Sequence, residues 1–289
     1  MNAFTIKDLE NLSGIKAHTI RIWEQRYSFL KPQRTETNIR YYNSQELRTI
    51  LNIALLAKYG YKISHIDKMN EDDVKKSIIS LSAAEAQQDR MVNELIQCMI
   101  GIDIEKFENI LDNYILSKGI DKTIIQIIFP FLDRIGILWM TNNITPGQEH
   151  LITNIIRQKL IVGIEGVTTH ISCNKVVLLF LPEGEYHELG LLYVSYLLKR
   201  HGVCVLYMGA DVPLRDLRQV YKIKTPDYLY THITCDFKIE KYFAQFHSAM
   251  PNVQLIISGR ISHKIKNKSL HLANVKRSLA EVMEFVSSL

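Results

Sequence analysis

The sequence predicts a multidomain protein of mixed α and α/β class, and three observations support this prediction. The chain has 289 residues, which is more than one small domain needs. Residues 71–171 show helical periodicity with no convincing strand, whereas residues 175–289 alternate between strand and helix patterns. We therefore expect a winged helix-turn-helix domain at 1–70, a four-helix bundle at 76–171 and a doubly wound, Rossmann-like α/β domain at 174–289.

The composition is that of a globular protein. Hydrophobic residues make up 47% and charged residues 22%, which argues against a disordered chain. Apolar stretches such as 124–132 fall short of the ~20 residues that a membrane helix needs, and the opening residues do not resemble a signal peptide. We therefore expect a cytoplasmic protein with no membrane partner. The net charge of +5 is modest, but basic residues gather within 14–48, which suits a polyanion.

The four cysteines are too far apart in sequence to indicate a zinc or dithiol site. They form no CxxC motif, so buried free thiols are expected at Cys98, Cys173, Cys204 and Cys235.

The amino-terminal residues predict a DNA-binding element. A short helix that ends at Gly14 and a second helix over 16–27 make a helix-turn-helix, whose second helix fits the major groove. On the second helix, Ile20 and Trp23 can face the core. Thr19, Arg21 and Arg26 can face outward, where arginines supply contacts to phosphate and guanine.

The polar loop after this helix predicts a wing. It ends in Arg40-Tyr41-Tyr42, which would place Arg34 and Arg40 near the DNA backbone. A further helix capped by Asn43 or Ser44 would follow.

These motifs resemble the MerR family of winged-helix regulators. The matching residues are 19–27, Lys31-Pro-x-Arg34 and Arg40-Tyr-Tyr42, and they occur in one register. The resemblance implies dimers on a palindromic double-stranded operator, with Arg21, Tyr27, Arg40 and Tyr41 near DNA. The plainer alternative is a small helical domain with a solvated basic face. Metal-sensing members keep a cysteine cluster beyond a long dimerising helix, and this sequence lacks one, which disfavours metal sensing.

The carboxy-terminal pattern places ligand-binding loops after its strands. Strands are predicted at 175–181, 203–208, 228–232 and 253–258, and helices at 187–201, 213–223, 239–249 and 278–289. Doubly wound folds bind ligands at the carboxyl ends of their strands, so the loops after Leu181, His232 and Ser258 are the candidate site.

The first of these loops carries a histidine with an acidic partner. His187 can present an imidazole nitrogen to a ligand, and Glu185 can accept the other N–H and fix the tautomer. A lone loop histidine is more often a polar surface residue, so the context of the loop decides between the two interpretations.

That context resembles the cobalamin-binding fold of methionine synthase and the corrinoid mutases. The motif is Glu185-x-His187-x-x-Gly190, where those proteins usually have Asp, and Glu occurs in light-sensing cobalamin regulators. The resemblance implies that His187 replaces the benzimidazole base below cobalt. It also places Thr231, Thr234 and the pair Ser258-Gly259 near the displaced nucleotide tail. Ser258-Gly259 stands where the family usually has Gly-Gly. The Arg260 that follows departs from the family pattern and makes the space for the nucleotide less certain.

The helical middle region adds a third motif. Thr145-Pro-Gly-Gln148 predicts a helix start, so Trp139 ends one helix while Glu149 and His150 begin the next. Together with the Glu-x-His loop, this Trp-x9-Glu-His pattern resembles the adenosylcobalamin photoreceptor repressors of the CarH/LitR type. In those proteins, these residues lie at the upper, adenosyl face. In the best understood member of that type, a histidine directly follows the Trp, whereas this chain has Met140.

The function predicted from these resemblances is transcriptional repression, and no enzyme activity is expected. The protein would bind adenosylcobalamin, self-assemble as a homodimer or homotetramer on DNA, and release it when light breaks the cobalt–carbon bond. Three alternatives stay open: a cobalamin-level sensor without photochemistry, a corrinoid carrier or mutase subunit, and a regulator that binds no cobalamin.

Overall fold

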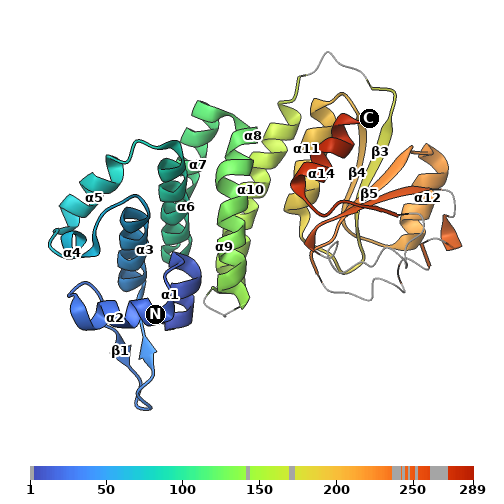
Figure 1. Ribbon diagram of the computed structural model, residues 1–289. Coiled ribbons are helices and arrows are strands. Elements are labelled where there is room, and N and C mark those ends of the chain that lie inside the picture. Colours follow the sequence, from blue (N-terminus) through green and yellow to red (C-terminus); the bar gives the residue numbers. More distant parts are fainter. Residues whose placement is uncertain are drawn as a thin grey trace. The chain divides into compact units, whose positions relative to one another are not determined.

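The protein was analysed as a computed structural model that describes residues 3–140, 144–168, 173–235, 242, 245–246, 248–250, 253–260 and 273–289. The chain forms two compact units, Met1–Ile155 and Ile156–Leu289 (Figure 1). Among the described residues, no helix combines the length and apolarity needed to cross a membrane. The division into three domains at 1–70, 76–171 and 174–289 stays a prediction.

The first unit begins with the predicted winged helix-turn-helix. It comprises α1 (Ile6–Ser13), α2 (Ala17–Arg26), the antiparallel wing β1 (Gln33–Arg34) and β2 (Arg40–Tyr41), and α3 (Ser44–Lys58). Gly14 ends α1 in the left-handed conformation at φ 75°, as its position predicts. Asn43 caps α3 by accepting from the Glu46 N–H. Ile20 and Trp23 are buried, as expected for the core side of α2.

The rest of this unit is helical throughout its described part. Two short helices precede the helices of the bundle. A π-helical segment lies directly before the bundle helix that contains Pro130. The elements are α4 (Ile63–Ile66), α5 (Glu71–Ile79), α6 (Ala84–Gly101), α7 (Ile104–Lys118), α8 (Ile120–Thr123), η1 (Ile124–Ile128), α9 (Phe129–Met140) and α10 (Pro146–Glu165), which continues past the end of this unit at Ile155. The predicted cap at Thr145 is confirmed, because its Oγ1 accepts from the Gln148 N–H at 3.2 Å and the Gln148 side chain accepts from the Thr145 N–H at 3.0 Å.

Asp89 ties the last turn of α3 to the bundle. Its carboxylate accepts from Lys58 Nζ at 2.5 Å and from the Tyr59 hydroxyl at 3.0 Å, and it lies 3.8 Å from Arg134 of α9. Arg134 also donates to Asn93 Oδ1 of α6 at 2.5 Å. The helix-turn-helix and the bundle are therefore joined by polar contacts as well as by apolar packing.

The second unit is a parallel five-stranded sheet in the order β4-β3-β5-β6-β7. The strands are β3 (Val176–Pro182), β4 (Cys204–Val212), β5 (Tyr228–His232), β6 (Gln254–Ser258) and β7 (Ala273–Val275). The connection from β3 goes to one side and later strands are added on the other, so the topological switch point lies between β3 and β5.

Helices cover both faces of the sheet, which confirms the doubly wound fold. α11 (Glu188–Arg200) and α14 (Leu279–Ser287) lie on one face and α12 (Leu214–Lys224) on the other (Figure 1). Strand β4 continues to Val212, beyond the predicted end at 208, and β7 was not predicted. Most of the predicted helix at 239–249 lies outside the described residues.

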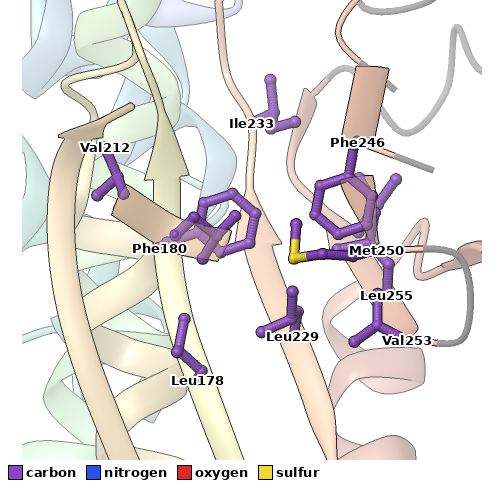
Figure 2. Close-up of a cluster of buried hydrophobic side chains, with 11 residues drawn as sticks. Leu178, Phe180, Val212, Leu229, Ile233, Phe246, Met250, Val253 and Leu255 are labelled. Atoms are coloured by element: carbon purple, nitrogen blue, oxygen red, sulfur yellow. The ribbon is translucent and has the colours of Figure 1, made fainter. Parts of the chain in front are cut away.

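A buried apolar cluster holds the central strands in place (Figure 2). Leu178 and Phe180 of β3 and Leu229 of β5 are 0% exposed, and the Phe180 and Phe246 rings stack with centroids 6.4 Å apart. This packing fixes the carboxyl ends of β3 and β5, where the candidate loops begin.

Candidate functional site

The loop between β3 and α11 places Glu185 and His187 at the switch point. The Gly184 N–H donates to Asp211 Oδ1 at 2.8 Å, and the Asp211 N–H donates to the Glu185 carbonyl at 3.2 Å. These contacts hold the loop against the end of β4. His187 then occupies the N-cap position of α11, one residue before the helix begins.

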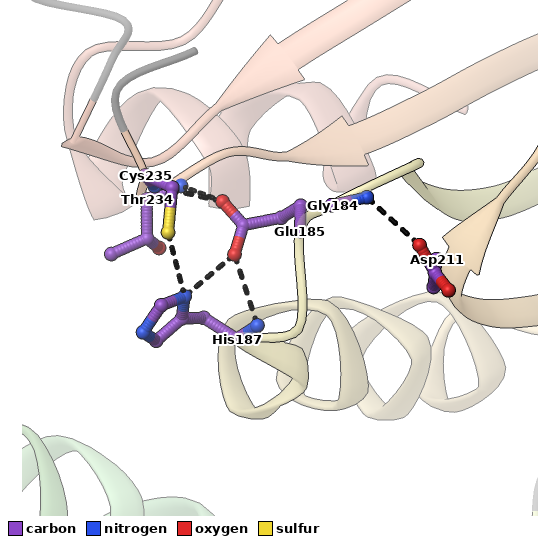
Figure 3. A network of polar contacts seen from close by, with 6 residues as sticks. All are labelled: Gly184, Glu185, His187, Asp211, Thr234 and Cys235. Atoms are coloured by element: carbon purple, nitrogen blue, oxygen red, sulfur yellow. Dashed lines mark hydrogen bonds and ion pairs between the residues drawn. The ribbon is translucent and has the colours of Figure 1, made fainter.

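Glu185 is a buried carboxylate whose oxygens are all engaged (Figure 3). Oε2 accepts from the backbone N–H groups of Thr234 at 2.7 Å and Cys235 at 2.8 Å, while Oε1 accepts from the His187 N–H at 3.0 Å. Oε1 also lies 2.6 Å from His187 Nδ1. Burial raises the pKa of this carboxyl, but the hydrogen bonds from His187, Cys235 and Thr234 outweigh it and lower the pKa to about 2.

The ring of His187 is oriented by this carboxylate. Since ionised Glu185 can only accept, Nδ1 carries the proton and Nε2 keeps its lone pair on the far side of the ring (Figure 3). The His187 side chain is 56% exposed, so the ring borders solvent. The structure thus joins the two residues that the sequence paired, in a geometry that suits a metal-binding imidazole.

Cys235 is a neighbour that the sequence did not point to. Its Sγ lies 3.4 Å from His187 Nδ1, and the ligand atoms of Glu185, His187 and Cys235 lie within 4.8 Å of one another. The expectation of four buried thiols is wrong, because Cys98 is buried whereas Cys204 is exposed. The only sequence signal for Cys235 was its position three residues after the end of β5.

A second polar group lies across the ends of β5 and β6. Ser258 is buried; its Oγ accepts from the Tyr230 hydroxyl at 2.7 Å and lies 2.9 Å from His232 Nδ1. Burial lowers the pKa of His232 to about 4, so its ring is neutral near pH 7 and can accept the Ser258 hydroxyl proton. Thr231 is also buried, and its Oγ1 has no hydrogen-bond partner among the described residues.

Two glycines keep side chains away from these strand ends. A Cβ at Gly190 would lie 2.4 Å from His232 Nε2, and a Cβ at Gly259 would lie 2.4 Å from the Ile233 carbonyl oxygen. Gly259 also has a φ of 94°. Both positions therefore require glycine, for close packing at Gly190 and additionally for backbone conformation at Gly259. Arg260, which follows, is exposed.

The residues predicted for the upper cofactor face lie in the first unit. Trp139 belongs to α9, but its side chain is outside the described residues. Glu149 and His150 lie in the first turns of α10, where His150 Nε2 is 3.5 Å from Glu149 Oε2. Their predicted role in cofactor binding is not tested by this arrangement.

The predicted DNA-binding residues fall into two groups. Arg21 and Arg26 on α2 are exposed, Thr19 is partly buried, and Tyr27 stacks on Phe29 with ring centroids 5.5 Å apart. On the wing, Arg34 donates to Asn38 Oδ1 at 2.7 Å and Tyr41 is partly buried.

Arg40 has a structural partner that the sequence did not indicate. Its Nε donates to Glu24 Oε2 at 3.0 Å, and Tyr42 donates to the other oxygen of the same carboxylate. Arg40 therefore helps attach the wing to α2, in addition to any contact with DNA.

Comparison with known proteins finds two family matches, one in the helix-turn-helix region and one in the helical bundle. Residues 4–72 match the MerR HTH family regulatory protein family, and residues 91–162, which form much of the bundle, match the B12 binding domain family. The chain carries a MerR helix-turn-helix domain and a B12-binding domain. It is homologous to the HTH-type transcriptional repressor CarH of Myxococcus xanthus, at 25% identity over 78% of this chain and 77% of that protein.

Two further proteins are similar to this chain. The repressor CarA of Myxococcus xanthus is 25% identical over 77% of this chain and 73% of its own length. The monomethylamine corrinoid protein of Methanosarcina barkeri superposes with a TM-score of 0.51 at 12% identity, over 70% of this chain and all of that one. The latter shows a shared fold. The family matches and the two repressors confirm the resemblance to MerR regulators and to CarH-type repressors.

The residues at the switch point fit a corrinoid. His187 offers an imidazole nitrogen whose ring is held by a carboxylate, which is the usual support for a metal-binding histidine. Thr231, whose hydroxyl has no partner among the described residues, and Gly259 lie at the neighbouring strand ends, and Gly190 faces them from α11. The donor chemistry thus suits such a ligand.

Proposed function

We propose that this protein is a transcriptional repressor that binds operator DNA and adenosylcobalamin and releases the DNA in light. The observation that carries the proposal is the Glu185–His187 pair at the switch point of a chain that also has a MerR domain. The homologous repressors CarH and CarA support regulation rather than catalysis.

The lower face of the cofactor is assigned to residues of the second unit. His187 Nε2 would bind cobalt, and Glu185 would hold the Nδ1 proton and the ring orientation. Thr231, Thr234, Ser258 and Gly259 would border the nucleotide tail, and Gly190 would give it room. Adenosylcobalamin supplies a light-sensitive cobalt–carbon bond when it is bound.

The upper face is assigned by resemblance alone. Trp139, Glu149 and His150 would contact the adenosyl side, as their counterparts do in the CarH/LitR type. Loss of those contacts would be the step that alters assembly. Met140 stands where that type has a histidine, and a thioether is a poor ligand for oxidised cobalt, so this chain would need a different ligand after illumination.

DNA binding is assigned to α2 and the wing. Arg21, Arg26 and Arg34 would contact phosphate or base edges, with Thr19, Tyr27, Arg40 and Tyr41 beside them. We propose that a homodimer or homotetramer presents several such domains, because linked weak sites bind far more tightly together than singly.

Spectroscopy combined with DNA binding tests this function. Protein reconstituted with adenosylcobalamin in the dark should show a histidine-ligated spectrum and retard operator DNA on a gel. Green light should change the spectrum and release the DNA. A protein that stays colourless after reconstitution would contradict the proposal.

A cobalamin-level sensor without photochemistry is the second candidate. Met140 favours it, because the histidine that follows Trp139 in the photoreceptors is missing. In that case, DNA binding would depend on the cofactor but would be equal in darkness and light.

A further inference from the structure

The first turn of α11 and the end of β5 are in close contact. Gly190 lies three residues after His187 on the same helix, and the His232 ring from β5 packs directly on it. A Cβ at Gly190 would come within 2.4 Å of His232 Nε2, 2.5 Å of Cδ2 and 2.8 Å of Cε1. The imidazole of His232 therefore occupies the space that the glycine leaves between the helix and the sheet.

This space adjoins the candidate cobalt ligand. His187 caps α11 and Gly190 follows it by one helical turn, so the His232 ring that packs on Gly190 lies close to the start of this helix. Thr231, the preceding residue of β5, is buried with its hydroxyl unpartnered among the described residues. We call the region between Gly190, Thr231 and Ser258 the tail slot.

The His232 ring is held only weakly in the tail slot. Among the described residues, its polar contact is the 2.9 Å hydrogen bond between Nδ1 and Ser258 Oγ, and the ring is neutral and partly buried. A neutral hydrogen bond of this kind makes only a small net contribution to stability, so the ring can leave at modest cost. Ser258 would keep its hydrogen bond from Tyr230 after the ring has left.

Ligand chemistry determines what must enter. If His187 takes the lower position on cobalt, as proposed above, the benzimidazole nucleotide of cobalamin is displaced but stays tethered to the same face. The tail must then lie beside His187. The tail slot is adjacent, and Gly190 projects no side chain into it from α11.

We infer that His232 is a displaceable plug of the tail slot and that it sets the preference of this protein between corrinoids with and without a nucleotide tail. The inference rests on the proposed function, because it requires His187 as the lower ligand. Intact cobalamin must expel the ring, whereas a cobinamide, which lacks the nucleotide, leaves it in place.

Affinities for two corrinoids test this role directly. Wild type and His232→Ala would be titrated in the dark with adenosylcobalamin and with adenosylcobinamide, followed by visible absorbance. His232→Ala should bind adenosylcobalamin about tenfold more tightly, which corresponds to ~1.4 kcal/mol, and adenosylcobinamide unchanged. His201→Ala, a histidine at the far end of α11, is the matched control and should change neither affinity.

Two further variants keep the result interpretable. His232→Val keeps a side chain suited to a strand while removing the ring, and it should reproduce the gain if His232→Ala folds poorly. Ser258→Ala removes the hydrogen bond that holds the ring, but it also removes the acceptor of the Tyr230 hydroxyl and a side chain proposed to border the tail, so it should give a smaller gain for adenosylcobalamin alone. Equal or weaker adenosylcobalamin binding by the folded His232 variants would overturn the inference.

His187→Ala separates this inference from the proposed function. It should lose the histidine-ligated spectrum with both corrinoids, while His232→Ala keeps it. An unchanged spectrum in His187→Ala would contradict the assigned lower ligand, and it would remove the reason for a displaced tail. If wild type and every variant bind neither corrinoid, the proposed function and this inference both fail.

Discussion

Glu185 shows how one buried carboxylate can organise a site. It accepts from three backbone N–H groups and faces the His187 ring, so Glu185→Gln replaces an anion by an amide that cannot satisfy all these donors. We expect cobalamin affinity to fall ~10–100-fold, as for other residues that support metal ligands. Absorbance titration measures the change. Glu183→Gln, an exposed neighbour, should bind normally, and equal losses in the two variants would contradict the role of Glu185.

The same carboxylate should make the cofactor-free protein sensitive to acid. Its pKa in the folded protein is about 2, below the ordinary 4.5, so its stabilising effect is complete above pH 4.5 and is lost as the pH falls toward 2. The full loss would be of the order of 3 kcal/mol in the free energy of unfolding. Urea unfolding at pH 7 and pH 3 should show a smaller pH dependence for Glu185→Gln than for wild type. Parallel curves would refute this prediction.

Arg21 and Arg40 should contribute differently to DNA binding. Arg21 is exposed on α2, so Arg21→Ala should weaken operator binding and lower the salt slope by ~1 without affecting the fold. Arg40 is bound to Glu24, so Arg40→Ala should weaken DNA binding and also loosen the wing.

Gel shifts at several salt concentrations measure the loss of DNA affinity, and hydrogen exchange of 33–41 measures the loosening of the wing. Lys118→Ala, at the end of α7, controls for lost charge. Unchanged affinity in both arginine variants would contradict the assigned DNA surface.

At the scale of the element, two glycines should differ in what alanine costs. Gly14 ends α1 in open space, so Gly14→Ala should cost only about 1 kcal/mol for its left-handed backbone. Gly259 has a positive φ and would also place a Cβ against the Ile233 backbone, so Gly259→Ala should cost clearly more. Chemical unfolding followed by circular dichroism makes the comparison. A smaller loss of unfolding free energy for Gly259→Ala than for Gly14→Ala would mean that the backbone at the end of β6 can shift to accommodate a Cβ.

The elements show which information the sequence contained. The apolar run of β3, the strand at 228–232 and the capping box at Thr145 were predictable, because each is encoded by nearby residues. Strand β7 has only three residues, which is too short for a periodic signal. The donors to Glu185 from Thr234 and Cys235 are backbone groups 49 and 50 residues away, and residue type does not reveal such partners. The packing of His232 on Gly190 is likewise non-local.

At the scale of the whole molecule, light should change assembly. In the proposed repressor, illumination of the adenosylcobalamin-bound protein lowers both its oligomeric state and its DNA affinity, since avidity is lost when copies separate. Size-exclusion chromatography under dim red light and after green light measures the first property, and gel shifts measure the second. Methylcobalamin-loaded protein shows whether the adenosyl group is required. Identical elution and gel shifts in both conditions would favour the sensor without photochemistry.

The edges of the sheet have a consequence for solubility. Among the described residues, β4 and β7 are its outer strands. Strand β7 is very short, and β4 is irregular, with register shifts against β3 and positive φ at Gly209 and Asp211. Short or bulged edges are poor templates for a foreign strand, so neither outer strand invites the open-ended stacking that leads to fibres. Aggregation through these sheet edges is therefore disfavoured. When copies of this protein do associate, helical surfaces rather than strand edges should provide the contact.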